Sequence, residues 1–286
     1  MSMPGGPVSD PPTPGRRSWA DVGPRLASAI VLIVLTATTL YVGSYLFAAV
    51  VGAVYGGVYR EWEAMISRAP LSPMSMAVMT LLGLSALVHP LLGIAGSAAA
   101  IALAATIALF MGRQRMVWRM SGIVVFGLLI VSVLTMRGTG MDGVWAGVYL
   151  GTVVWMTDSA AFFTGRQIGG EKLAPYISPS KTWSGAIGGL ALGTGAGLLV
   201  WTLFTDSPLW IGLLLSMAIS ILGQSGDLLE SAIKRHFRIK DSGDIIPGHG
   251  GLMDRLDSLT FGAFLVVIVG GLHAGFGAVA QGLLYW

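Results

Sequence analysis

Carboxylates and basic side chains are concentrated in residues 223–258, which read GQSGDLLESAIKRHFRIKDSGDIIPGHGGLMDRLDS. This stretch holds six of the 14 acidic residues and five of the 17 basic residues of the chain. Asp227, Glu230, Ser231 and Lys234 are three or four positions apart, so a helix places them on one face. Glu230 precedes Lys234 by four residues, which is the favourable order for a helical ion pair. Asp227 has no basic residue at that spacing, and we expect it to bind a metal ion or to act on phosphate.

Asp254 and Asp257 form a second pair of carboxylates, at the start of the last long apolar run. Asp257 also suits the N-terminal cap of a helix. Mg²⁺ prefers oxygen ligands and keeps coordination positions open for substrate oxygens. Two carboxylates that come from different helices and face a phosphate would hold this ion. We therefore predict Asp227 and Asp254 as Mg²⁺ ligands, and whether a second cation accompanies Mg²⁺ is left open.

The basic residues and glycines between these carboxylates are typical of a phosphate-binding site. Glycines let backbone N–H groups approach an anion closely, and Lys and Arg supply the opposite charge. The pair Lys234-Arg235 taken alone is also typical of charges that set membrane topology or contact lipid headgroups. We predict that phosphate is bound by Lys234, Arg235, Lys240 and the glycine-flanked His249.

A second polar segment, residues 164–184, contains the sequence ISPSK. The hydroxyls of Ser178 and Ser180 and the ammonium of Lys181 suit a phosphate group. Asp158 precedes this segment and lies inside an apolar run, and Arg166 comes eight residues after Asp158. A carboxylate at membrane depth is usually paired or functional. Asp158 therefore either forms a structural ion pair with a neighbouring helix or belongs to a substrate or metal site.

The composition shows that membrane-spanning helices must position these residues. The chain has 286 residues, of which 54% are hydrophobic and 11% charged, and its mean hydropathy is +0.75. A soluble globule cannot bury that much apolar surface. The absence of cysteine excludes a disulfide scaffold, a cysteine–zinc site and a thiol nucleophile. The net charge of +3 is small and dispersed, which argues against a nucleic-acid partner.

We predict an all-α, polytopic integral membrane protein with about nine transmembrane helices. About 20 helical residues cross the hydrocarbon core of a bilayer. The run from Leu26 to Tyr59 is long enough for two spans that meet near Gly43-Ser44, and Arg60 to Pro73 is predicted as a polar loop. The other predicted spans are Met74–Val88 and Leu91–Met111 on either side of His89-Pro90, Gly122–Met136, Gly143–Phe163, Gly185–Phe204, Leu209–Leu229, and Asp257 to about Gly277.

Nine spans place 16 of the 17 Lys and Arg residues on one face, and only Arg137 falls on the other. The positive-inside rule assigns that face and the N-terminus to the cytoplasm, and the C-terminus to the outside, of what we expect to be a bacterial inner membrane. Residues 1–24 are predicted as a disordered, proline-rich tail. Residues 25–286 form one membrane domain, with N-terminal helices in 25–136 and a catalytic region in 143–261 that carries cytoplasmic loops 164–184 and 230–256.

Four glycines recur every four residues in one predicted span, at positions 185, 189, 193 and 197. Glycine at this spacing lets helix backbones approach closely. The stripe therefore predicts tight packing, either inside the bundle or at the interface of a homodimer.

The segment from Ser231 to Asp257 resembles the signature of the phosphatidate cytidylyltransferase (CDP-diacylglycerol synthase) family. That pattern is Ser-x-apolar-Lys-Arg, four residues, Lys-Asp-x-small, two residues, apolar-Pro-x-His-Gly-Gly, then apolar-x-Asp-Arg-apolar-Asp. The upstream GDLLES and KLAPYISPSKTWSGAIGG are also similar to the family. Two positions depart from it: Ser184 follows KTW where Glu is usual, and Phe162 stands where Tyr is frequent. No role is assigned to either.

The resemblance implies a nucleotidyltransferase that converts CTP and phosphatidic acid into CDP-diacylglycerol and pyrophosphate. Mg²⁺ on Asp227 and Asp254 would assist attack of the lipid phosphate on the α-phosphorus of CTP. Asp241 would be a second metal ligand or would orient Lys240. The residues implied in catalysis are Asp227, Asp254, Lys234, Arg235, Lys240, Asp241 and His249. Those implied in substrate binding are Lys181, Ser178, Ser180, Ser231, Asp158, Arg166 and Asp257.

Three other functions are compatible with parts of this pattern. A CTP-dependent lipid kinase would transfer the γ-phosphoryl group and release CDP. A transporter would use intramembrane carboxylates as a relay, but here the carboxylates cluster at one face. A lipid-binding scaffold would not need the glycine-flanked His249.

Overall fold

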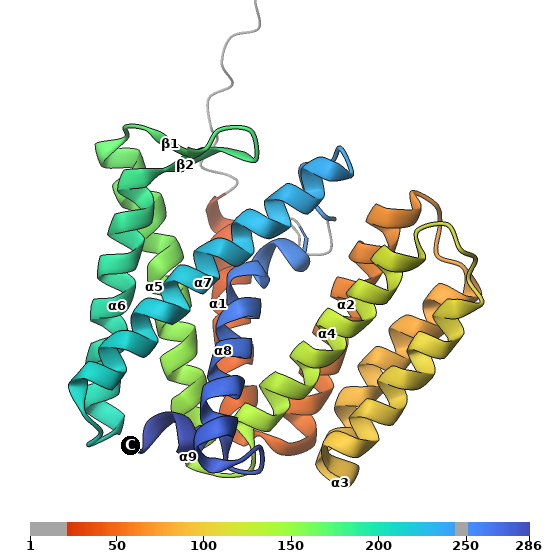
Figure 1. The fold of residues 1–286 in the computed structure, drawn as a ribbon, viewed down its shortest axis with the longest axis horizontal. Coiled ribbons are helices and arrows are strands. Elements are labelled where there is room, and N and C mark those ends of the chain that lie inside the picture. The colour runs from red at the N-terminus through yellow and green to blue at the C-terminus, as the bar shows by residue number, and fades with distance from the viewer. Residues whose placement is uncertain (1–21, 244–250) are drawn as a thin grey trace, which may run out of the picture.

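The computed structural model describes residues 22–243 and 251–286, and most of these residues are helical (Figure 1). Most of the predicted N-terminal tail, and His249, lie outside the described residues. The elements in chain order are α1 (Val22–Val42), α2 (Ser44–Ser67), α3 (Pro73–Leu109), α4 (Met116–Arg137), α5 (Met141–Ile168), β1 (Lys172–Ala174), β2 (Ser178–Thr182), α6 (Trp183–Phe204), α7 (Leu209–His236), the 3₁₀ turn η2 (Met253–Arg255), α8 (Asp257–Ala274) and α9 (Val279–Leu284).

Five of the described helices are long and apolar enough to cross a membrane: α3, α4, α6, α7 and α8. The helix α3 reverses direction at Gly93, whose φ of 62° and ψ of −155° lie outside the helical range. Its two arms touch, since Ser97 Oγ donates to Ser85 O at 2.9 Å (Figure 1). The predicted break in this region is therefore present, but the turn lies at Gly93 and not at His89-Pro90. The long apolar helices confirm the all-α membrane fold, while the count of nine spans stays a prediction.

Several predicted boundaries were wrong because helices continue past the apolar runs. The predicted loop from Arg60 to Pro73 is helical as far as Ser67, the end of α2. Glu63 can remain in this helix although it is buried, because its carboxylate forms an ion pair with Arg119 of α4 at 2.8 Å. Likewise α5 and α7 extend into the predicted loops 164–184 and 230–256. The first of these loops also forms the antiparallel hairpin β1–β2, which the sequence patterns did not predict.

The glycine stripe of α6 packs against other helices of the same chain, which is the first of the two predicted alternatives. All four glycines are buried, and α6 lies along α5. A β-carbon at Gly193 would lie 2.1 Å from Thr157 Oγ1, and one at Gly189 would lie 2.8 Å from Thr157 O. At Gly197 it would lie 2.4 Å from Ser216 Oγ of α7. Contacts within one molecule therefore account for this face, without a second subunit.

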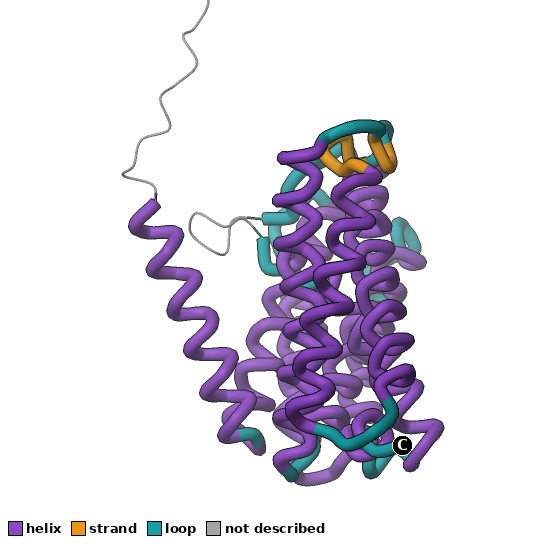
Figure 2. Tube along the Cα trace, turned by 90° about the vertical axis from the view of Figure 1, so that its left-hand side faces the viewer, coloured by secondary structure: helices purple, strands orange, loops and turns teal. Residues whose placement is uncertain are grey.

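The two ends of the bundle differ in chemistry. The hairpin and the C-terminal end of α7 lie at one end, and the C-terminus of the chain lies at the other (Figure 1). Arg137 is the basic residue at the C-terminal end of α4, where it is buried and donates to Leu40 O and Tyr41 O of α1. These bonds hold the C-terminal end of α1. The helix α1 itself diverges from the other helices, as Figure 2 shows. The basic residue predicted opposite the other sixteen is thus a structural one.

Candidate functional site

A polar cavity of about 680 Å³ opens at the hairpin end of the bundle. Its walls come from α5, the hairpin, the start of α6, α7, η2 and α8. Predicted acidic and predicted basic site residues line it together, and Lys172 and Arg255 join them, so four carboxylates and five cations lie within one cavity. The carboxylates are Asp158, Asp227, Asp254 and Asp257, and the cations are Arg166, Lys172, Lys181, Lys234 and Arg255.

The hairpin brings Lys181 against Asp227. The two charged atoms, Lys181 Nζ and Asp227 Oδ2, are 2.5 Å apart, and Ser231 Oγ donates to Asp227 Oδ1 at 3.4 Å. Neighbouring residues in the sequence supplied no cation for Asp227, which suggested that a metal ion would compensate its charge. The structure supplies a cation from β2, which lies 46 positions earlier, so Asp227 has an ion-pair partner that its neighbours in the sequence did not indicate, and its role as a metal ligand stays a prediction.

Lys234 connects Glu230, its predicted helical partner, to Asp254 of the predicted site. Its Nζ lies 3.0 Å from Glu230 Oε1 and 2.5 Å from Asp254 Oδ1. The helical ion pair of Glu230 with Lys234 is confirmed. It is not the solvated pair that a polar loop would contain, because the Glu230 side chain is only 10% exposed. Lys234 thus links α7 to the turn η2.

Asp254 is also held by donors from residues that precede it in the chain. Its Oδ2 accepts the Ser242 N–H at 3.1 Å, the Ser242 hydroxyl at 2.9 Å and the Gly251 N–H at 3.3 Å. Burial favours the neutral acid, but the Lys234 ammonium and the Ser242 donors outweigh it, so the pKa of Asp254 lies below its usual range. Asp254 is therefore an anion at neutral pH, with its carboxylate fixed in direction.

Glu61 of α2 belongs to the same network, and the sequence patterns missed it. Its side chain is buried, and it accepts the N–H groups of Leu252 and Met253, each at 2.9 Å. The Ser242 hydroxyl lies 3.1 Å from Glu61 Oε2. A β-carbon at Gly251 would lie 2.0 Å from that hydroxyl, so glycine is required there. Glu61 lies in a segment that was predicted as a loop, and its partner Ser242 is 181 residues away. No residue spacing could therefore have indicated this contact.

Asp158 and Asp257 meet at Ser258. The Ser258 hydroxyl donates to Asp158 Oδ1 at 3.2 Å, and the Ser258 N–H donates to Asp257 Oδ1 at 2.7 Å. Asp257 is the first residue of α8, where its charge complements the helix dipole, but the N-cap is Leu256 and no side chain caps the helix, so the predicted cap at Asp257 was wrong. Both carboxylates nevertheless line the cavity, which makes them available to a ligand.

The other predicted residues divide between the cavity and its surroundings. Arg166 and Ser180 line the cavity, whereas Ser178 does not. Arg235 is exposed, and its Nε donates to Ile177 O at 3.3 Å, so it joins α7 to the hairpin. Lys240 and Asp241 are exposed and do not line the cavity.

The two positions that depart from the family pattern also have clear places. Ser184 Oγ donates to Gly169 O at 2.5 Å, which fastens the start of α6 to the end of α5. Phe162 lines the cavity with 60% of its surface exposed.

The carboxylates suit a hard cation only together with further oxygen ligands. Among residues 22–243 and 251–286, no three His, Asp or Glu side chains are grouped closely enough to hold a metal ion. Asp227 and Asp254 each contact a lysine at 2.5 Å. Mg²⁺ is commonly bound by one or two carboxylates together with water and substrate phosphates. The donor set therefore fits Mg²⁺ when phosphate oxygens supply the remaining ligands. The same phosphate would also attract the two lysines that now contact the carboxylates.

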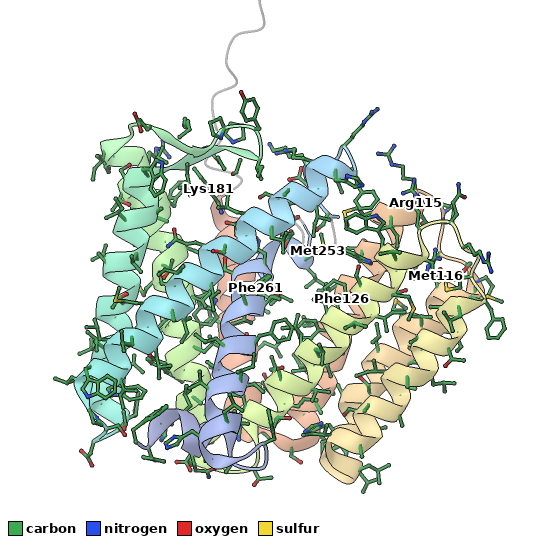
Figure 3. All side chains as sticks on the ribbon, in the orientation of Figure 1. Arg115, Met116, Phe126, Lys181, Met253 and Phe261 are labelled. Atoms are coloured by element: carbon green, nitrogen blue, oxygen red, sulfur yellow. The ribbon has the colours of Figure 1, made fainter. Side chains whose placement is uncertain are left out.

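A second, apolar cavity of about 400 Å³ lies on the other side of α7, between α2, α4 and α8. Asp257 lines both cavities. Figure 3 labels three of the apolar residues around it, Phe126, Met253 and Phe261. A charged cavity and an apolar cavity therefore lie side by side at the end of α8.

Comparison with known proteins agrees with this arrangement. The chain is 46% identical to a phosphatidate cytidylyltransferase of Brucella suis over 157 residues, which are 55% of this chain and 58% of the relative. It is 49% identical to that of Staphylococcus haemolyticus over 125 residues, 43% of this chain and 48% of the relative. For Bacillus subtilis the values are 46% over 118 residues, 40% and 42%. The matched part thus spans about half the length of these relatives.

A family model covers far more of the chain than these pairwise matches do. It extends from the third residue of α1 to the last turn of α8, and so includes every element that lines the polar cavity. Because the model of the cytidylyltransferase family matches residues 24–273, this protein belongs to that family.

Proposed function

We propose that this protein is a CTP:phosphatidate cytidylyltransferase, which makes CDP-diacylglycerol and pyrophosphate. The relatives in Brucella, Staphylococcus and Bacillus carry that name, and family membership supports cytidylyl transfer. The observation that carries the proposal is the polar cavity, in which four carboxylates and five cations are set at the end of apolar helices. Such a cavity suits a highly charged nucleotide and the headgroup of a lipid at once.

The reaction needs positioning and charge neutralisation more than a protein nucleophile. An anionic oxygen of the phosphatidate headgroup attacks the α-phosphorus of CTP. The new P–O bond forms as the bond from the α-phosphorus to the bridging oxygen breaks, and pyrophosphate leaves with that electron pair. Lys181 and Lys234 line the cavity beside Asp227 and Asp254. They are therefore the cations placed to neutralise the phosphates.

Asp227 and Asp254 remain the proposed ligands of Mg²⁺, which would supply Lewis-acid stabilisation of the phosphate oxygens. Asp158 and Asp257 line the same cavity and extend its set of oxygen donors. Arg166 and Ser180 are proposed to contact substrate. Roles for Arg235, Lys240 and Asp241 at the reacting atoms are not proposed, because these residues do not line the cavity.

The apolar cavity supports a lipid as one of the two substrates. It is lined mostly by apolar side chains, and it shares Asp257 with the polar cavity. Acyl chains in the apolar space and a headgroup in the polar one would satisfy both ends of phosphatidate.

The charge distribution supports a location in the cytoplasmic membrane of a bacterium. The basic residues of the hairpin and of the end of α7 lie at the end where the polar cavity opens. The positive-inside rule places that end, and the N-terminus, in the cytoplasm and the C-terminus outside. CTP would then reach the cavity from the side where it is made.

The test is turnover by purified protein with labelled CTP and phosphatidic acid. We expect a CDP-lipid and pyrophosphate, and we expect Asp227→Asn to abolish both, because it removes the charge that pairs with Lys181 and that a hard cation needs. Asp206→Asn, at the exposed turn between α6 and α7, is the matched control and should retain activity. Release of CDP with a phosphorylated lipid would show a lipid kinase and refute the proposal.

A further inference from the structure

Three arginines gather in a pocket that shares no lining residue with the polar cavity. The pocket has a volume of about 380 Å³ and lies where α2 ends, α4 begins and α7 ends. Among the described residues no carboxylate lines it, so the positive charge is not balanced there. The lining residues are Arg68, Arg115, Trp118, His236, Phe237 and Arg238.

The backbone holds all three arginines in the left-handed conformation. Their φ values are 53° for Arg68, 64° for Arg115 and 55° for Arg238. In the described part of the chain, one other non-glycine residue, Ser44, has a positive φ. This conformation costs about 1–2 kcal/mol for a residue with a β-carbon and is concentrated at functional sites. Three such residues around one pocket are difficult to explain by chain reversal alone, for which Gly or Asn would suffice.

Two of the guanidinium groups are fixed in place by the opposite helix end. Arg68 donates to Phe237 O, and Arg115 donates to Ile66 O. Each bond uses one of the five N–H donors of a guanidinium group, so these contacts cap helix ends and still leave donors for a ligand. The Arg115 guanidinium also lies 5.7 Å from the ring centroid of Phe237. Arg68 and Arg115 are thus preorganised before a ligand binds.

Aromatic rings form the floor of the pocket. The ring centroid of Trp118 lies 5.2 Å from that of His236 and 5.1 Å from that of Phe237. Trp118 is near the start of α4, and His236 is the last residue of α7, both of which are long enough to span a membrane. Tryptophan and arginine at the end of a span are typical of the layer of lipid headgroups. Figure 3 shows Arg115 at this end of the bundle.

We propose that this arginine pocket is a second binding site for a phosphate-bearing anion, apart from the polar cavity. Planar guanidinium groups recognise phosphate through paired N–H donors, which a single lysine cannot offer. The phosphate can belong to an anionic phospholipid headgroup or to a soluble phosphate compound, because both present the same oxygens. The position at the ends of α4 and α7 makes the headgroup accessible from the bilayer.

Native mass spectrometry of the full chain in detergent tests the proposal, with phosphatidylglycerol as the probe. A juxtamembrane arginine contributes about 1 kcal/mol to binding an anionic surface, or roughly fivefold in affinity. Arg238→Gln should therefore weaken binding by about fivefold. Its side chain is exposed and forms no hydrogen bond or ion pair within the described residues, so folding should be unaffected. Together with Arg68→Gln and Arg115→Gln, the loss should be on the order of a hundredfold.

The matched control is Arg113→Gln, which removes the same charge from an exposed arginine two positions from Arg115 and outside the pocket. It should bind phosphatidylglycerol as the unchanged protein does. Equal loss in Arg113→Gln and Arg238→Gln would show a diffuse basic surface and overturn the proposal, as would unchanged binding by Arg238→Gln. Displacement of bound lipid by millimolar inorganic phosphate would identify the bare phosphate as sufficient. Retention of the lipid would identify the headgroup in its bilayer setting.

Discussion

Replacing Glu61 with glutamine tests whether a carboxylate of α2 holds the loop that carries Asp254. Glu61 accepts the N–H groups of Leu252 and Met253, one on each carboxylate oxygen, and its Oε2 lies 3.1 Å from the Ser242 hydroxyl. Glutamine has almost the same shape, but it has one acceptor oxygen, and its amide nitrogen can only donate. At least one of the two backbone N–H groups therefore loses its partner and faces another donor.

The magnitude follows from the kind of bond that is lost. A hydrogen bond to a charged group contributes about 1.5–3 kcal/mol when its partner is buried. Glu61 is 3% exposed, so water does not replace the lost acceptor in the closed state. Opening of the loop at Leu252 and Met253 should become easier by that amount, which corresponds to roughly 10- to 150-fold faster amide exchange. Turnover should fall by at least about tenfold, because Asp254 is no longer held in place.

Hydrogen exchange of residues 251–256 and CDP-lipid formation are the two measurements, and the first does not depend on the proposed activity. Glu63→Gln is the matched control, since Glu63 lies on the same helix and is equally buried but pairs with Arg119. The control should lower the melting temperature without accelerating exchange in the loop. Unchanged exchange at Leu252 and Met253 in Glu61→Gln would refute the reasoning.

Two further predictions concern packing and topology. Gly193→Ala should destabilise the bundle by about 1–3 kcal/mol, because its β-carbon would lie 2.1 Å from Thr157 Oγ1. Gly195→Ala, on the same helix with nothing within 4 Å of its β-carbon, should leave the melting temperature unchanged or raise it, and equal loss in both variants would exclude a steric cause. In this cysteine-free chain, Tyr176→Cys should react with an impermeant thiol reagent only from the cytoplasmic side. Thr139→Cys should react only from the outside, and the reverse pattern would invert the proposed topology.

The sequence determined the class of this protein and much of its site. Its hydropathy alone required membrane helices, and the segregation of basic residues marked one end of the bundle as polar. Helical spacing predicted the Glu230–Lys234 pair correctly, because residues four apart on a helix are neighbours in any fold. The motif from Ser231 to Asp257 indicated the family, since its fixed residue types occur in a fixed order.

Only the tertiary structure decided what each of these residues faces. Lys181 contacts Asp227 from a hairpin that no periodic pattern predicted. Glu61 contacts the loop that carries Asp254, although the two are far apart in the sequence. Arg235 stands beside Lys234 in the sequence but contacts the hairpin, outside the cavity. Local spacing reports neighbours within one helix, whereas the partners of a buried charge are chosen by how separate helices pack. Long-range ion pairs of this kind leave no periodic trace in a single sequence.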